Sequence, residues 1–276
     1  MTALTLVQAP APIAVSPRAR SLRPGEVVVL SIMAPAASEA VRVRAFDTDV
    51  AAYKDGETWR AIVGIDLDVN PGTYRVAVES GAAENVSRGA FDLAIVARTF
   101  RTRRLTVDPA FVTPPASELP RIDRESALLA ATWEASAMRR LWTTAFVRPV
   151  RQAANSAFGT RSIFNGEPRN SHGGADFLSP AGTPIGAPNA GRIAVARSLY
   201  FSGNTVIIDH GLGLFSTLAH LSRIDVDEGE MVTPGQRVGL VGATGRVTGA
   251  HLHWAVRAGA ARVDPLSLLA VLGADR

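Results

Sequence analysis

His251-Leu252-His253-Trp254-Ala255-Val256 alternates two histidines and an alanine with three large apolar side chains. This period of two is typical of a β-strand with one face on a core, because successive side chains of a strand point to opposite faces. The three apolar side chains therefore face the core, and His251 and His253 share the other face. The stretch predicts a strand that directs two imidazoles into one cavity.

A third histidine stands four residues before an aspartate, in His172-Gly173-Gly174-Ala175-Asp176. Two adjacent glycines each disfavour a helix by about 1 kcal/mol relative to alanine, so we expect a turn that enters a strand at Ala175. Two imidazoles and one carboxylate are donors that suit Zn²⁺, and three protein ligands with an open fourth position are typical of a catalytic site. The alternative is a set of core histidines whose hydrogen bonds the protein satisfies.

All five histidines lie in the second half of the chain, at positions 172, 210, 220, 251 and 253. Glycines and β-branched residues alternate there, and no helical period occurs before Leu266. We therefore expect a β-rich second domain over residues 156–272. His210 follows a predicted strand, and we interpret it as a structural residue in a turn with Gly211.

Residues 13–107 have the pattern of an immunoglobulin-like β sandwich. Turn dipeptides such as Asp55-Gly56 and Pro71-Gly72 separate short runs rich in β-branched residues. Five strands are predicted, over Val27 to Ile32, Val41 to Phe46, Trp59 to Ile65, Thr73 to Val78 and Ala90 to Ala97.

Residues 108–155 are predicted to connect the two domains. Four prolines between Asp108 and Pro120 predict an extended segment. A linker helix is expected to follow, with Asp123 as its N-cap. Its apolar stripe repeats every fourth residue, at Leu129, Trp133, Ala137 and Leu141.

The composition excludes several classes of protein. Hydrophobic residues make up 47% and charged residues 20%, which is typical of a globular chain. The 29 basic and 25 acidic side chains are spread along the sequence, which argues against nucleic-acid binding. Arg101, Arg103 and Arg104 form the densest basic run, which we interpret as a solvated strand end. The absence of cysteine excludes thiolate catalysis and disulfides.

No apolar run approaches the roughly 20 residues that span a bilayer, so we expect no stable membrane insertion. The first fifteen residues are apolar but lack a basic start and contain Pro10 and Pro12, which makes them a poor signal peptide.

Residues from about Arg161 to Pro265 resemble the zinc peptidase domain of the lysostaphin-type family of bacterial cell-wall endopeptidases. The similarity rests on an ordered set of short motifs spread over about 105 residues. They are Asn165-Gly166, Arg169, His172 to Asp176, Gly182-Thr183-Pro184, Ala190-Gly191, Gly203 to Gly211, Ala219-His220-Leu221-Ser222, Val232 to Gln236, Gly242 to Gly245, Gly249, His251-Leu252-His253 and Asp264-Pro265. The N-terminal segment is similar to the β domain that precedes this module in some members.

The resemblance implies a barrel-sandwich-like peptidase fold in which His172, Asp176 and His253 bind Zn²⁺. It makes His220 and His251 the catalytic pair beside the metal. Such an ion polarises the scissile carbonyl and lowers the pKa of water from 15.7 toward about 7, while an imidazole with a pKa near 6.5 takes the proton. Which of the two histidines is the base and which stabilises the oxyanion or protonates the leaving amine stays open.

This sequence departs from the family pattern at Leu218, where many members have a tyrosine two residues before the histidine equivalent to His220. Any role for a phenol at this position is therefore unsupported here.

Two further stretches resemble known sequence motifs but lack the residues that those motifs require. Glu228 to Gln236 resembles biotinyl and lipoyl carrier domains, but the sole lysine, Lys54, is in the other domain. Gly242 to Gly249 lacks the Gly-Lys-Ser/Thr ending of a phosphate loop, and we expect a rim loop beside His251 instead.

The resemblance predicts a periplasmic or secreted zinc endopeptidase that cleaves peptide bonds in peptidoglycan stem peptides or cross-links. Its expected partner is peptidoglycan peptide, and a cell-envelope regulator that docks on the N-terminal domain is a further candidate. The alternative is a non-catalytic cell-wall binding scaffold that activates another murein hydrolase. Such relatives lose metal ligands or the accompanying histidines, whereas all five positions are filled here.

Overall fold

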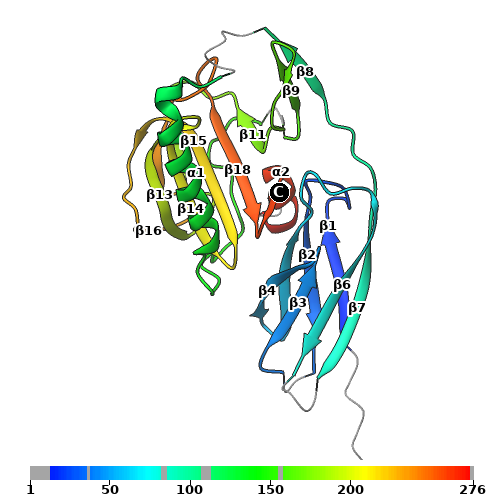
Figure 1. Cartoon of the computed structure of the whole chain (residues 1–276). Coiled ribbons are helices and arrows are strands. Elements are labelled where there is room, and N and C mark those ends of the chain that lie inside the picture. Colours follow the sequence, from blue (N-terminus) through cyan, green and yellow to red (C-terminus); the bar gives the residue numbers. More distant parts are fainter. Residues whose placement is uncertain (1–12, 36–37, 82–85, 107–112, 155–157, 274–276) are drawn as a thin grey trace, which may run out of the picture.

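The computed structural model describes residues 13–35, 38–81, 86–106, 113–154 and 158–273. The chain is mainly β, as predicted, and its strands form three sheets (Figure 1). The predicted extended connector and the first twelve residues lie partly or wholly outside the described residues. Within the described ranges, neither α-helix is long and apolar enough to cross a membrane.

The N-terminal part is a seven-stranded antiparallel sandwich in the order β1-β2-β5-β4-β3-β6-β7. Its strands are β1 (Ala14–Ala19), β2 (Val27–Met33), β3 (Val41–Ala45), β4 (Thr48–Asp55), β5 (Thr58–Gly64), β6 (Gly72–Ser80) and β7 (Ser87–Ile95). Residues 48–51 of β4 pair with β3 and residues 52–55 pair with β5, so β4 joins two layers. Leu30 and Val63 from one layer and Val43 and Val78 from the other share one core. The prediction of a β sandwich is confirmed, although the sequence patterns missed β1 and β4.

A small three-stranded sheet lies at the end of the molecule where β11 begins (Figure 1). Strand β8 (Thr102–Leu105) is parallel to β9 (Arg161–Phe164), and β10 (Glu167–Pro168) is antiparallel to β9. Strand β8 falls within the predicted range 13–107 but pairs outside the sandwich.

The third sheet has nine strands, in the order β11-β18-β15-β14-β13-β16, with β17 joining β12 and β15 and with β19 beside β18. They are β11 (Gly174–Phe177), β12 (Pro184–Gly186), β13 (Gly191–Leu199), β14 (Gly203–Gly211), β15 (Leu214–Ile224), β16 (Met231–Val232), β17 (Arg237–Val241), β18 (Leu252–Ala258) and β19 (Ala261–Val263). In β18, Leu252, Trp254 and Val256 are buried in one core with Leu218, and the residues between them are half-buried. The predicted strand and its apolar face are confirmed.

Helix α1 (Leu119–Glu134) follows a 3₁₀ turn at Ala116–Glu118 and lies across β13 to β15 (Figure 1). The predicted start at Asp123 is wrong, because Pro120 fits the first turn and the helix begins earlier. The predicted end is also wrong. Beyond Glu134 the backbone turns away because Ala137 N donates to the Asp209 carboxylate and Leu141 N donates to the His210 carbonyl, so Ala137 and Leu141 are not helical.

The outer face of β2 joins the sandwich to the second half of the chain. Val27 and Val29 belong to the core of the nine-stranded sheet and helix α2 (Pro265–Leu272), not to the sandwich core. Next to them, Glu26 and Asp264 are both buried and share the guanidinium group of Arg20, at 2.6 and 2.8 Å. The two parts are therefore held together by apolar contacts and a buried ion-pair cluster.

Candidate metal centre

Two neighbouring strands bring an aspartate opposite a histidine. Strand β11 is antiparallel to β18 with Asp176 paired to His253, so the two side chains share one face. His172 lies just before β11, and its backbone N–H donates to the Thr160 carbonyl. A Cβ at Gly174 would lie 2.5 Å from the Trp254 carbonyl oxygen and 2.7 Å from the His253 ring. Only glycine allows the approach that brings His172 to the strand pair.

Three donor atoms converge at this point. His172 Nε2 and His253 Nδ1 lie 3.1 and 3.0 Å from the same Asp176 oxygen, and the two nitrogens are 2.9 Å apart. Zinc bonds of about 2.0–2.1 Å in a tetrahedral site place ligand atoms about 3.3 Å apart, so the three donors fit one ion. Each side chain is about a fifth exposed, which leaves one side of the site open.

The electrostatics favour an ionised Asp176 and a neutral His253. Burial raises the pKa of Asp176, but hydrogen bonds from His172 and His253 outweigh it and hold the pKa well below its usual value. Burial also lowers the pKa of His253, against the opposing hydrogen bond to Asp176. An ionised carboxylate and a neutral imidazole this close need a cation or a shared proton between their lone pairs.

His220 and His251 lie beside this centre. Their ring centroids are 4.9 Å apart, and the His220 ring lies 5.9 Å from that of His253. Nδ1 of His220 contacts the Thr244 carbonyl and Nδ1 of His251 contacts the Gly249 carbonyl, each at 2.9 Å. A carbonyl only accepts, so each Nδ1 carries a proton. Burial lowers the pKa of His220 to about 4, so this imidazole is neutral at pH 7.

A bulge in β15 turns His220 toward the site. Val206 pairs with Leu218 and Asn204 pairs with Leu221, so two residues, Ala219 and His220, face one residue of β14. His220 has a left-handed φ of 67°. Regular alternation would have placed His220 on the same face as Leu218, which is fully buried opposite Trp254. The family departure at position 218 therefore affects the core.

His210 is not part of this group. It lies within β14, not in a turn after the strand as predicted, and it is fully buried. Its Nδ1 contacts the Ala190 carbonyl at 2.8 Å and its Nε2 contacts Ser216 Oγ at 2.9 Å. Burial lowers the pKa of His210 to about 4, so it is a neutral core residue.

Thr244 is a site residue that the sequence analysis did not single out. Its carbonyl accepts from His220, its hydroxyl donates to the Leu221 carbonyl, and the same hydroxyl accepts from Asn204 N. A Cβ at Gly203 would lie 2.3 Å from Thr244, so glycine is required for this contact. The only sequence signal was the glycine-rich stretch 242–249, which predicted a rim loop without showing that it orients a catalytic candidate.

Comparisons with known proteins place this geometry in context. Residues 170–265 match the model of peptidase family M23. The chain is 46% identical over 83 residues to peptidoglycan DD-endopeptidase ShyA of Vibrio cholerae and 40% identical over 97 residues to DD-carboxypeptidase/endopeptidase Mpg of Neisseria meningitidis. These alignments cover 30% and 35% of this chain but only 19% and 22% of the relatives, so the chain matches about a fifth of their length. The structure is also similar to a crystal structure of a candidate peptidase M23 from Pseudomonas aeruginosa, with a TM-score of 0.71 and 32% identity over 91% of this chain and 96% of the other.

Proposed function

Because this chain belongs to peptidase family M23, we propose that it is a zinc-dependent endopeptidase that hydrolyses peptide bonds in peptidoglycan stem peptides or cross-links. The observation that carries the proposal is the convergence of His172, Asp176 and His253 at about 3 Å beside two further imidazoles. The names of the relatives, which are peptidoglycan DD-endopeptidase and DD-carboxypeptidase/endopeptidase, support the substrate class.

His172, Asp176 and His253 would hold the ion. A bound zinc ion supplies Lewis-acid polarisation of a carbonyl group and lowers the pKa of water. Nε2 of His220 has its lone pair free and its ring is neutral, so we assign this residue the role of general base. His251, half-buried at the rim with Nε2 3.7 Å from the Asp176 oxygen, would stabilise developing negative charge or protonate the leaving amine.

We also propose the organisation and location of the enzyme. The chain divides into an N-terminal part over 13–107 that contains the sandwich, a connector with its helix over 108–155 and a peptidase domain over 156–272. A peptidoglycan substrate places the enzyme in the periplasm or outside the cell, and the sandwich is the surface on which a cell-envelope regulator would dock.

The test is hydrolysis of purified sacculi by zinc-loaded protein, with and without a chelator. We expect soluble muropeptides whose release stops on complete zinc removal and returns when zinc is restored. Mass spectrometry of the products identifies the bond cleaved. Release that survives complete removal of the metal would reject the metallopeptidase. No release by zinc-loaded protein that still binds sacculi would favour the scaffold that activates another hydrolase.

A further inference from the structure

The three arginines of one face of the small sheet are the strongest charged feature that the proposed mechanism leaves unused. Arg103 on β8 is paired with Ser162 on β9, and Arg103 Nε donates to Ser162 Oγ at 2.9 Å. Arg169, just after β10, donates its backbone N–H to the Ser162 carbonyl, which continues the β9–β10 register. Arg101 stands two residues before Arg103. Alternation therefore places Arg101, Arg103 and Arg169 on the same face.

Among the described residues, this face has no carboxylate partner. Within the ranges that the structure describes, none of the three guanidinium groups lies within ion-pair distance of an acidic side chain, and Nε of Arg169 is buried without a hydrogen-bond partner. Arginines elsewhere, such as Arg197 and Arg262, are paired. A buried guanidinium N–H without an acceptor is costly, which favours an anion as the missing partner.

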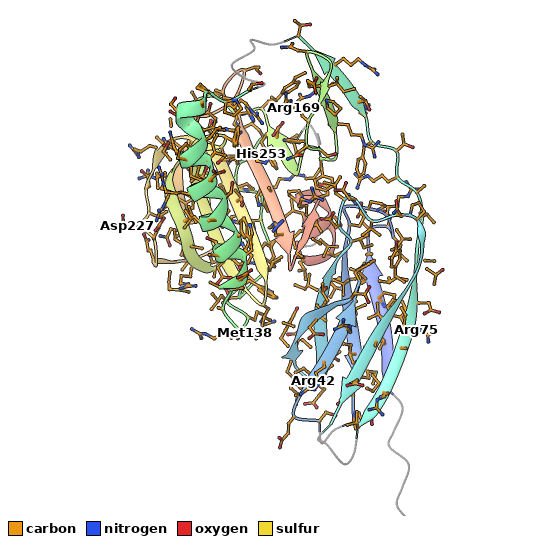
Figure 2. All side chains as sticks on the ribbon, in the orientation of Figure 1. Arg42, Arg75, Met138, Arg169, Asp227 and His253 are labelled. Carbon is orange, nitrogen blue, oxygen red and sulfur yellow. The ribbon has the colours of Figure 1, made fainter. Side chains whose placement is uncertain are left out.

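Backbone contacts join this sheet to the metal centre. The carbonyl of His172 accepts from Gly159 N, and its backbone N–H donates to the Thr160 carbonyl. The next residue, Arg161, donates its backbone N–H to the Arg101 carbonyl. Strand β9 therefore starts beside a proposed metal ligand. Figure 2 shows Arg169 at the same end of the molecule as His253, next to this sheet.

A fourth arginine approaches from the rim loop. Arg246 is two residues from Thr244, whose carbonyl holds His220, and its guanidinium lies 4.6 Å from the centre of the Phe201 ring. Burial, and then the positive charge of nearby Arg169, lower the pKa of Arg246. Arg246 therefore approaches Arg169 from the rim-loop side of the metal centre.

We propose that Arg103, Arg169 and Arg246 form a subsite that binds a carboxylate of the peptide substrate next to the scissile bond. The inference rests on the proposed function and deepens it, because it makes carboxylate-bearing peptides the preferred substrates. A guanidinium group pairs with a carboxylate through two parallel hydrogen bonds, so the subsite fixes the orientation of the peptide as well as its charge. For Arg103 alone, this role would replace the interpretation of the basic run as a solvated strand end.

The test compares a soluble cross-linked muropeptide with the same compound after carbodiimide amidation of its free carboxyl groups, using zinc-loaded enzyme. Amidation should raise the KM of the wild-type enzyme about tenfold, the size expected for one charge-assisted pair, and leave kcat nearly unchanged. Arg169→Gln should raise the KM for the native muropeptide by a similar factor and lose its sensitivity to amidation. Arg169→Lys should recover part of the affinity, because it keeps the charge without the planar fork.

Arg42→Gln is the matched control. Arg42 is an exposed arginine on β3 of the sandwich, far from His253 in Figure 2, and its replacement should leave KM unchanged. Equal KM values of the wild type for both muropeptides, or an Arg169→Gln enzyme that still discriminates between them, would overturn the subsite while the peptidase stands. Cleavage of neither compound by zinc-saturated wild type would overturn the proposed function and the subsite with it.

Discussion

Nδ1 of His220 lies 2.9 Å from the carbonyl oxygen of Thr244. This contact fixes the tautomer, because the carbonyl needs the imidazole proton on Nδ1, and so it leaves the lone pair on Nε2. The bulge at His220 then turns the ring to the face that carries His253. The Thr244 carbonyl and the bulge together orient the imidazole that we propose as the general base.

Replacement of His220 tests this assignment. Asparagine is the suitable variant because it tolerates the left-handed backbone conformation that His220 adopts. We expect His220→Asn to retain bound zinc and to lower kcat by about 10²–10⁴-fold, the usual contribution of a general base. Turnover of a muropeptide together with the zinc content of the purified protein measures both effects.

His251→Ala is the companion variant. It should keep the metal and lose turnover, since His251 contacts the Gly249 carbonyl and lies outside the three-donor set. Wild-type rates from His251→Ala would remove this residue from the mechanism. Zinc loss in either variant would instead make that histidine a ligand.

Removal of a proposed ligand has the opposite signature. His253→Ala deletes the nitrogen that lies 3.0 Å from the Asp176 oxygen and 2.9 Å from His172 Nε2. We expect this variant to lose zinc and activity together, because two remaining donors bind a zinc ion weakly. Metal analysis after dialysis gives the answer, with His210→Gln as a control that keeps its zinc. Stoichiometric zinc in His253→Ala would contradict the ligand assignment.

The buried ion-pair cluster between the sandwich and α2 should be important for stability. Glu26 is 2% exposed and accepts from Arg20 at 2.6 Å and from Ser267 Oγ at 2.8 Å. Glu26→Ala leaves the partly exposed guanidinium groups of Arg20 and Arg98 with Asp264 as their remaining partner, so the loss should be at or below the about 3–5 kcal/mol typical of a broken buried ion pair. Urea unfolding should show this loss, whereas Glu79→Ala, which removes an exposed pair with Arg88, should cost less than about 1 kcal/mol.

Local patterns predicted the strands of the site but not the bulge and the loop that complete it. Alternation in residues 251–256 predicted the buried face of β18, because strand geometry follows directly from the side-chain period. The same rule places His220 on the core side with Leu218. Only the unequal pairing of β14 and β15, which is a tertiary feature, reverses it.

The linker helix shows the same limit at its ends. The apolar stripe predicted a helix, but its periodicity continued past Glu134 into residues that are not helical. Ser136 Oγ and Ala137 N both donate to the buried carboxylate of Asp209, and this long-range contact ends the helix. Thr244 was missed for a similar reason, because its role depends on the carbonyl that faces His220 and not on its side-chain type.

Acid should weaken the contact between Asp66 and Arg262, which joins the end of the sandwich to β19. Burial raises the pKa of Asp66, but hydrogen bonds from the Arg262 guanidinium and backbone, and from Asp68 N, outweigh it, and the net shift is downward. The unfolded carboxyl has a pKa near 3.9, so in acid it binds more protons than the folded one. This stabilisation is therefore present above about pH 4 and lost as the pH falls below it.

Asp66→Asn should lower the stability at pH 7 and flatten its decline below pH 4. Asp68→Asn is the control, because its side chain is 69% exposed, and it should change both far less. Urea midpoints measured from pH 3 to pH 7 test this, and an Asp66→Asn profile parallel to that of the wild type would contradict it.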